Sequence, residues 1–328
     1  MTEQYDLTAL GEVLIDFTEA GISAGGMRLF EQNPGGAVAN VLAAAARFGC
    51  KTAFLGKAGA DMHGVFLRDT LQAAGIDTGG LILDPGFFTT LAFVALSETG
   101  ERTFSFARKP GADNQLRPEE LPAGVLSHTR ILHVGSLSLT AEPARSATFA
   151  ALEQARRGGA VISYDPNYRA SLWPDRETAI THMRSVLPYV DVMKFSGEET
   201  VLLTGCGDAE EAALALTRAG ISCVAVTLGG AGALVCAGEE TALVPGFQIP
   251  VTDTTGAGDA FWGGFLSRLL ALGKAPGRCT LDDVRSFARW GCATAALCIQ
   301  RRGAIPAMPS RSQVEALLAD RLADTSAQ

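Results

Sequence analysis

A glycine-rich segment that ends in an aspartate is the stretch of this chain best suited to chemistry. Residues 253–259 read Asp-Thr-Thr-Gly-Ala-Gly-Asp, and residues 260–270 are apolar with helical spacing. The pattern predicts a helix whose first N–H groups, at Gly256, Ala257 and Gly258, lack partners within the helix and carry the positive end of its dipole. Such a helix start is suited to binding a phosphate group.

Asp259 is unexpected at a simple phosphate site, because its carboxylate would repel the phosphate. Its presence is explained if the carboxylate removes a proton from a hydroxyl group that then attacks phosphorus. The structural alternative is an ordinary helix that follows a glycine loop, and an isolated Gly-x-Gly-Asp would favour that alternative. The choice between them depends on the other residues that the fold brings to this segment.

A second pair of glycines, Gly35 and Gly36, precedes a helix expected over residues 41–49. Asn40 can donate and accept hydrogen bonds, as recognition of a sugar-like hydroxyl requires. Asp16 stands among apolar neighbours, where an unpaired carboxylate is costly. We interpret it either as a ligand of the substrate or as a strand-end residue that faces solvent.

From residue 130 onward, expected strands alternate with expected helices. The strands are 131–134, 160–164, 190–195 and 223–228, and the helices are 143–156, 177–187, 197–203 and 209–219. This alternation predicts a mainly parallel sheet covered by helices on both faces, which binds ligands at the carboxyl ends of its strands. Seven residues just past the strand ends are therefore expected along one edge of the sheet: Asp165, Asn167, Arg169, Ser196, Glu199, Thr227 and Gly229.

Outside this region the pattern is more varied. Strands are expected over 5–17 and 51–56, hairpins over 18–33 and 91–107, and helices over 65–74, 281–300 and 310–322. The second hairpin has its turn at residues 98–101 and is followed by Arg108. Arg108 is expected either to reach the active site or to end the strand in solvent.

The composition is that of a globular protein with a large core. Hydrophobic residues make up 47% and charged residues 19% of the 328 residues. A net charge of −8 without a Lys/Arg cluster argues against nucleic acid as a partner. No apolar run approaches the roughly 20 residues that span a bilayer, and the N-terminus does not resemble a signal peptide. Seven cysteines without a C-x-x-C pair indicate a cytoplasmic protein with reduced thiols.

Over essentially its whole length the sequence resembles the ribokinase/PfkB family of carbohydrate kinases, and bacterial fructokinases most of all. Residues 253–259 and 263–266 match the C-terminal signature of the family. The N-terminal signature is matched at Gly35, Gly36, Asn40, Gly49 and Gly59. Residues 227–232 resemble the nucleotide-binding turn, and residues 194–199 resemble the N-x-x-E segment, with Ser196 in place of the usual asparagine.

The resemblance implies a ribokinase-like three-layer α/β fold over residues 1–328. In this fold a mainly parallel central sheet is flanked by helices and a small β lid covers the sugar. The natural lid segments here lie near residues 12–33 and 87–108. Lids of this kind often pair between subunits, so the resemblance also predicts a homodimer.

Roles for individual residues follow from the same resemblance. Asp259 is expected to be the general base, and the N–H groups of Gly256, Ala257 and Gly258 to form the anion hole. The expected substrate-binding residues are Asp16, Gly35, Gly36, Asn40, Arg108 and Arg169, and the expected ATP-binding residues are Ser196, Thr227, Gly229 and Gly232. Glu199 would hold Mg²⁺ through water. Asp253, Thr255 and Gly303 match a loop that binds a monovalent cation such as K⁺ in many members.

The implied activity is ATP-dependent phosphorylation of a sugar hydroxyl, with fructose converted to fructose 6-phosphate. One alternative is a 2-keto-3-deoxygluconate kinase, whose acidic substrate would pair with Arg108 and Arg169. Asp113 disfavours that substrate if it lines the pocket. An alternative of a different class is a sugar or nucleotide sensor without turnover, although such a protein need not retain Asp259, the glycines and Glu199. A nicotinamide oxidoreductase is weakly supported, because no G-x-G-x-x-G follows the first strand.

Overall fold

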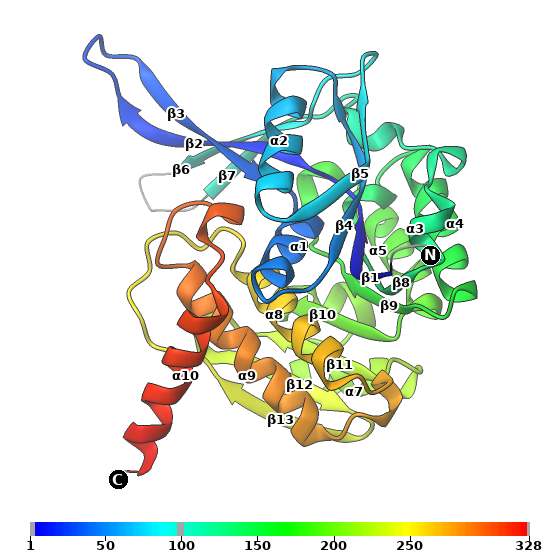
Figure 1. Cartoon of the computed structure of the whole chain (residues 1–328), viewed down its shortest axis with the longest axis vertical. Helices are drawn as coiled ribbons and strands as arrows, with labels where there is room; N and C mark the ends of the chain where they lie inside the picture. The colour runs from blue at the N-terminus through cyan, green and yellow to red at the C-terminus, as the bar shows by residue number, and fades with distance from the viewer. Residues whose placement is uncertain (1–3, 97–101, 327–328) are drawn as a thin grey trace.

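A nine-stranded sheet forms the centre of the computed structural model, which describes residues 4–96 and 102–326 (Figure 1). Its strands stand in the order β13 (Glu240–Pro245), β12 (Gly232–Ala237), β11 (Cys223–Thr227), β10 (Val192–Ser196), β9 (Val161–Asp165), β8 (Thr129–Gly135), β1 (Tyr5–Leu10), β4 (Thr52–Gly59) and β5 (Ile76–Asp84). Neighbouring strands run parallel except where β12 pairs with β11 and with β13. The expected mainly parallel sheet is confirmed.

Helices cover both faces of this sheet. One face carries α1 (Ala37–Arg47), α2 (Met62–Ala73), α8 (Ala257–Leu272) and α9 (Leu281–Cys298), with α10 (Arg311–Ser326) packed outside α9. The other face carries α3 (Ala123–Leu126), α4 (Ala144–Arg157), α5 (Arg176–Ser185), α6 (Thr200–Thr204) and α7 (Ala209–Arg218). Successive residues of β11 enter opposite cores, so the protein has the three layers that the sequence predicts. Among the described residues, no helix is both long and apolar enough to cross a membrane.

A second, smaller sheet has the strand order β3 (Arg28–Gly35), β2 (Leu14–Ile22), β6 (Leu91–Leu96) and β7 (Arg102–Ala107). Its two hairpins are joined by parallel pairing of β2 with β6. In Figure 1, β2 and β3 project from the body of the molecule at the upper left. The two hairpins are the ones that the sequence predicts, although residues 98–101 lie outside the described residues.

Some elements differ from the sequence prediction. The strand expected over residues 5–17 is two strands, β1 and β2, which belong to different sheets. The chain turns between them at Gly11, where a Cβ would lie 2.8 Å from Val38 Cγ2. Strands β5, β12 and β13 were not predicted. In β5 the pair Gly79–Gly80 interrupts the apolar alternation that marks a strand.

Helix α8 is held closely against its neighbours. A Cβ at Gly263 would lie 2.5 Å from Ala44 Cβ of α1, and the neighbouring glycine allows a similar approach to α9. The Trp262 indole donates a hydrogen bond of 2.9 Å to Ser163 Oγ, which connects α8 to β9. These contacts place the first turn of α8 against the carboxyl ends of the central strands.

Candidate active site

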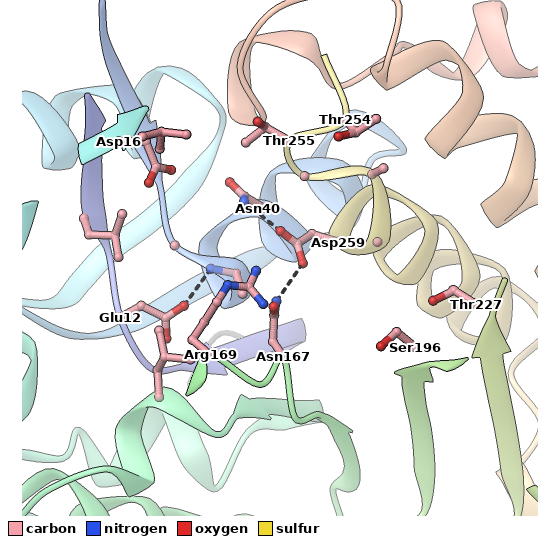
Figure 2. Close-up of a pocket in the computed structure, with 18 of the residues that line it drawn as sticks. Glu12, Asp16, Asn40, Asn167, Arg169, Ser196, Thr227, Thr254, Thr255 and Asp259 are labelled. Atoms are coloured by element: carbon pink, nitrogen blue, oxygen red, sulfur yellow. Dashed lines mark hydrogen bonds between the residues drawn. The ribbon is translucent and has the colours of Figure 1, made fainter. Parts of the chain in front are cut away.

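A cavity of about 300 Å³ lies beside the first turn of α8. Its walls come from the small sheet (Leu14, Asp16, Thr18, Val94), the start of α1 (Gly36, Ala37, Asn40), the strand ends (Asn167, Arg169, Lys194, Ser196, Thr227) and residues 254–259. Figure 2 shows the Asp259 carboxylate between the side chains of Asn40 and Asn167. Parts of the chain that are remote in sequence therefore converge on one carboxylate.

Asp259 is held by two amide side chains. Its Oδ2 accepts a hydrogen bond of 2.8 Å from Asn40 Nδ2, although the two residues are 219 positions apart. Its Oδ1 accepts a longer hydrogen bond, 3.3 Å, from Asn167 Nδ2. Burial raises the pKa of Asp259 to about 6, against the opposing effect of the Lys194 ammonium. A carboxylate with this pKa can accept a proton near neutral pH, as a general base must.

The start of α8 requires glycine for two reasons. Gly256 has φ +74°, and a Cβ at that position would lie 2.5 Å from Ala304 Cβ. The helix has no side-chain cap, although the N–H of Ala257 donates a 3.3 Å hydrogen bond to the carbonyl oxygen of Thr254. Residues 256–258 line the cavity together with Asp259, so this helix start is open to an anion.

The sugar-side residues expected from the sequence divide into two groups. Asp16, Gly36, Asn40 and Arg169 line the same cavity as Asp259. Gly35 lies behind this wall, where a Cβ would overlap the Asp16 carboxylate. Gly35 therefore makes room for Asp16 and is not itself a cavity residue.

The expectation that Arg108 contacts the substrate is corrected by the structure, which places this side chain outside the cavity. Its guanidinium forms an ion pair of 2.5 Å with Asp113 and donates to Thr140 Oγ1 and to the Leu137 carbonyl oxygen, each at 2.9 Å. Arg108 thus connects the segment after β7 to the loop after β8. Asp113 does not line the cavity either, so it gives no reason to disfavour a carboxylate substrate.

A second cavity, also of about 300 Å³, adjoins the first. Four residues line both cavities: Thr227, Thr254, Ala257 and Gly258. Gly229 and Gly232 line the second cavity, as expected for the nucleotide side, and Cys292 contributes to its largely apolar wall. Ser196 lines only the first cavity. The two cavities therefore meet at the first turn of α8.

Both carboxylate oxygens of Glu199 accept hydrogen bonds from backbone N–H groups. Its Oε1 accepts from the N–H of Tyr168 at 2.6 Å and its Oε2 from the N–H of Ser196 at 2.7 Å. The side chain is buried and lines neither cavity. Within residues 4–96 and 102–326, no group of three or more His, Cys, Asp or Glu side chains is placed to hold a metal ion.

The three residues expected to form a cation-binding loop do come together. Asp253 Oδ1 accepts from the N–H of Thr255 at 3.0 Å and from its Oγ1 at 2.7 Å. Asp253 Oδ2 accepts from the N–H of Gly303 at 3.0 Å, across 50 positions of sequence. The Asp253 carboxylate thereby ties the loop before α8 to the loop after α9.

Lys194 is a site residue that the sequence analysis did not select. It lies in β10 between the fully buried Met193 and Phe195 and is itself only 6% exposed. Its Nζ pairs with Asp165 Oδ2 at 2.8 Å. The signal in the sequence was a lysine within an otherwise apolar strand, because a buried ammonium needs a partner.

Glu12 also lines the cavity, although the sequence analysis assigned it no role. It is 2% exposed, and its Oε1 accepts a hydrogen bond of 2.7 Å from the N–H of Ala37 at the start of α1. Its Oε2 has no hydrogen-bond partner among the described residues. Burial raises the pKa of Glu12 to about 7.

Comparison with known proteins gives consistent matches. The sequence profile described as pfkB family carbohydrate kinase matches residues 5–311. Probable fructokinase-4 of Arabidopsis thaliana is 40% identical over 318 residues, which cover 95% of this chain and 96% of that protein. The fructokinase with bound ATP from Xylella fastidiosa is 34% identical with a TM-score of 0.89, covering 97% of this chain and 99% of its own. A fructokinase double mutant from Vibrio cholerae O395, in fructose-, ADP- and potassium-bound form, is 34% identical with a TM-score of 0.86, covering 96% and 99%.

Proposed function

The chain belongs to the pfkB family of carbohydrate kinases, and from this premise we propose that it transfers the γ-phosphoryl group of ATP to fructose, giving fructose 6-phosphate. The proposal is supported by similarity to fructokinases over nearly the full length of both chains. The observation that carries it is the position of Asp259, a buried carboxylate at an uncapped helix start where two cavities meet. Phosphoryl transfer requires an acceptor, a base and an anion site at one point.

In the proposed reaction the sugar occupies the cavity beside the small sheet, with its primary hydroxyl against Asp259. Asp16 and Asn40 line that cavity and offer acceptors and donors to the other hydroxyls. Asp259 accepts the hydroxyl proton as the sugar oxygen attacks the γ-phosphorus in line. The N–H groups at residues 256–258 bind the negative charge on the transferred group.

ATP is proposed to occupy the second cavity, against Thr227, Gly229 and Gly232. A bound Mg²⁺ would neutralise charge on the phosphate oxygens. Glu199 would act on that ion through water, because its side chain lines neither cavity. A K⁺ ion in the loop tied by Asp253 is supported by the potassium-bound form of the Vibrio cholerae protein.

A 2-keto-3-deoxygluconate kinase is not favoured by the charges around the first cavity. Arg108, one of the two arginines that would pair with the acid, is occupied by Asp113. Arg169 and Lys194 do line the cavity, but Lys194 already pairs with Asp165. The carboxyl groups of Glu12, Asp16 and Asp259 line the cavity too. A keto acid would therefore bring a further negative charge to an already acidic site.

The proposal is tested by a coupled ADP-release assay with fructose, 2-keto-3-deoxygluconate, ribose, tagatose and nucleosides. We expect the highest kcat/KM with fructose, and phosphorus NMR should identify the product as the 6-phosphate. The highest kcat/KM with the keto acid would replace the proposed substrate. Calorimetric binding of fructose and ATP without turnover on any substrate would instead indicate a sensor.

We also propose a homodimer formed through the small sheet, which carries several exposed apolar side chains: Ile22, Leu29, Phe30 and Phe93. Phe93 stacks on Phe17 at 5.3 Å and meets Phe30 edge-on at 6.1 Å between ring centroids. Apolar side chains gathered on one sheet are typical of an interaction surface. Light scattering after size exclusion should give twice the monomer mass, and a Phe30→Glu variant should give the monomer.

A further inference from the structure

We propose that Lys194 is a second catalytic group of this site, whose ammonium binds the phosphoryl group during transfer while Asp165 holds it in place. The inference rests on the proposed kinase function and adds to it a residue that carries a full positive charge. It follows from the position of Lys194, from the charges around it and from its hydrogen bonds.

The position of Lys194 is next to the glycine-rich helix start. A Cβ added to Gly258 would lie 2.8 Å from Lys194 Nζ, so the ammonium lies against the backbone of the proposed anion hole. Lys194 lines the same cavity as Gly258 and Asp259. It reaches this place from β10, whose carboxyl end adjoins α8. A group bound to the N–H groups of the helix start therefore lies within reach of the ammonium.

The charges explain why a cation is needed there. The N–H groups of residues 256–258 are neutral dipoles, whereas the transferred phosphoryl group is anionic and approaches the Asp259 carboxylate, which repels it. Among the described residues that line the cavity, the cations are Arg169 and Lys194. Arg169 is exposed and donates to the carbonyl oxygen of its neighbour Tyr168 at 3.0 Å. Lys194 is the buried one, in the less screened environment.

Lys194 keeps its charge despite burial. Burial alone would lower the pKa of its ammonium, but the carboxylates of Asp165, Glu199 and Asp259 raise it above the ordinary value. Asp165 is fixed in turn, since its Oδ1 accepts from the N–H of Asn167 at 3.2 Å. An ammonium has three N–H donors, and within the described residues one is directed to Asp165 Oδ2. Two donors are therefore available to phosphoryl oxygens.

The reaction step is balanced without a proton from Lys194. The sugar hydroxyl proton passes to Asp259 while the bond from the sugar oxygen to the γ-phosphorus forms. The bond from that phosphorus to the β,γ-bridging oxygen breaks, and its electron pair leaves with ADP. Lys194 retains all three protons and stabilises the negative oxygens of the group in transit.

The test compares two buried lysines. Lys194→Met removes the ammonium at the cavity, and Lys57→Met removes a matched one that is 3% exposed and pairs with Asp84 and Glu120 at 3.1 and 2.7 Å outside both cavities. With ATP and fructose, Lys194→Met should lower kcat about 100-fold or more and leave the KM for fructose within about three-fold. Lys57→Met should keep kcat within about two-fold even if its melting temperature falls.

A double variant separates catalysis from structure. Lys194→Met leaves the Asp165 carboxylate buried without its partner, and Asp165→Asn in the same chain removes that charge. The double variant should regain stability but keep the low kcat. Recovery of kcat in the double variant to within about three-fold of wild type would overturn the proposal.

A pH profile excludes an effect transmitted only through Asp259. Lys194 lowers the pKa of Asp259, so Lys194→Met should move the acidic limb of kcat to higher pH, and the deficit should persist on the plateau. A deficit that disappears on the plateau would overturn the proposal. If the wild type turns over no sugar, the proposed function is wrong. If the wild type is active and Lys194→Met is equally active, only the inference about Lys194 is wrong.

Discussion

Helices α1 and α8 both begin after a glycine with positive φ and both line the cavity, yet within the described residues only at α1 does a carboxylate from a remote segment accept a first-turn N–H. Gly36 has φ +115° and Gly256 has φ +74°, and neither helix is capped by the side chain of its N-cap residue. At α1 the buried carboxylate of Glu12 accepts the N–H of Ala37. At α8 the carboxylate is Asp259 of the helix itself, which is turned towards Asn40 and leaves the first turn facing the cavity. Similar local sequences therefore form one helix start whose N–H is bonded by a remote carboxylate and one whose N–H groups can bind an anion, depending on what packs against them.

Removing the charge of Asp259 is the strongest test of the difference between the two helix starts. Asp259→Asn should lower kcat by about 1,000-fold or more, because the amide cannot take the hydroxyl proton, while calorimetric affinities for fructose and ATP stay within about three-fold. Turnover at several per cent of wild type would contradict the base assignment. The matched change at the start of α1, Glu12→Gln, should lower kcat at most about ten-fold.

The next largest effect is expected from a methyl group at the start of α8. Gly256→Ala would force a Cβ against Ala304 at positive φ, so we expect about a 100-fold loss of kcat and a loss of stability of roughly 1–2 kcal/mol. Gly273 at the other end of α8 is the control, since it has φ +69° and nothing within 4 Å of an added Cβ. Gly273→Ala should lose similar stability and keep its kcat. Equal kcat values for Gly256→Ala and Gly273→Ala would show that the loss of kcat does not depend on the position of the methyl group at the start of α8.

The wild-type pH profile should reveal the ionisation of Asp259. Burial raises the pKa of this carboxyl group to about 6, and the base must be ionised to accept a proton. Activity is therefore complete above that pKa and falls as the pH decreases through it, by about ten-fold for each further unit. Steady-state kcat/KM measured with fructose checks this limb. A profile that stays flat well below pH 6 would contradict the raised pKa.

Replacing Glu12 should have the smallest effect on turnover and should instead change the free energy of unfolding. Burial raises the pKa of Glu12 from 4.5 to about 7, so the folded protein binds its proton more tightly than the unfolded chain between these values. Stability is therefore lost as the pH rises through this window. Urea titrations at pH 5 and pH 8 should show Glu12→Gln gaining roughly 1–3 kcal/mol relative to wild type at the higher pH. An identical difference at both pH values would contradict this assignment.

Local patterns were sufficient for most of the sheet. From residue 130 onward, apolar runs of strand length alternate with helical spacing, and the structure contains the expected elements with small shifts at their ends. Strands β5 and β12–β13 were missed because glycines weaken their patterns, and because an antiparallel hairpin at a sheet edge breaks the alternation with helices.

Side-chain roles were less predictable than elements. Arg108 and Lys194 both follow or occupy strands, and both pair with an aspartate. Only the packing of other elements shows that Arg108 donates a hydrogen bond to Thr140 outside the cavity, whereas Lys194 lines the cavity. A sequence contains the charge of each residue but not the direction of its side chain.

The sequence by itself determined the chemistry available at the start of α8, because glycine freedom and a helix start are properties of neighbouring residues. It determined the family for the same reason, since the signatures are short and contiguous. The contact of Asn40 with Asp259, the raised pKa of that carboxylate and the approach of Lys194 to Gly258 were decided by the tertiary structure. Each depends on distance and burial between remote segments, and these quantities exist only once the layers have packed.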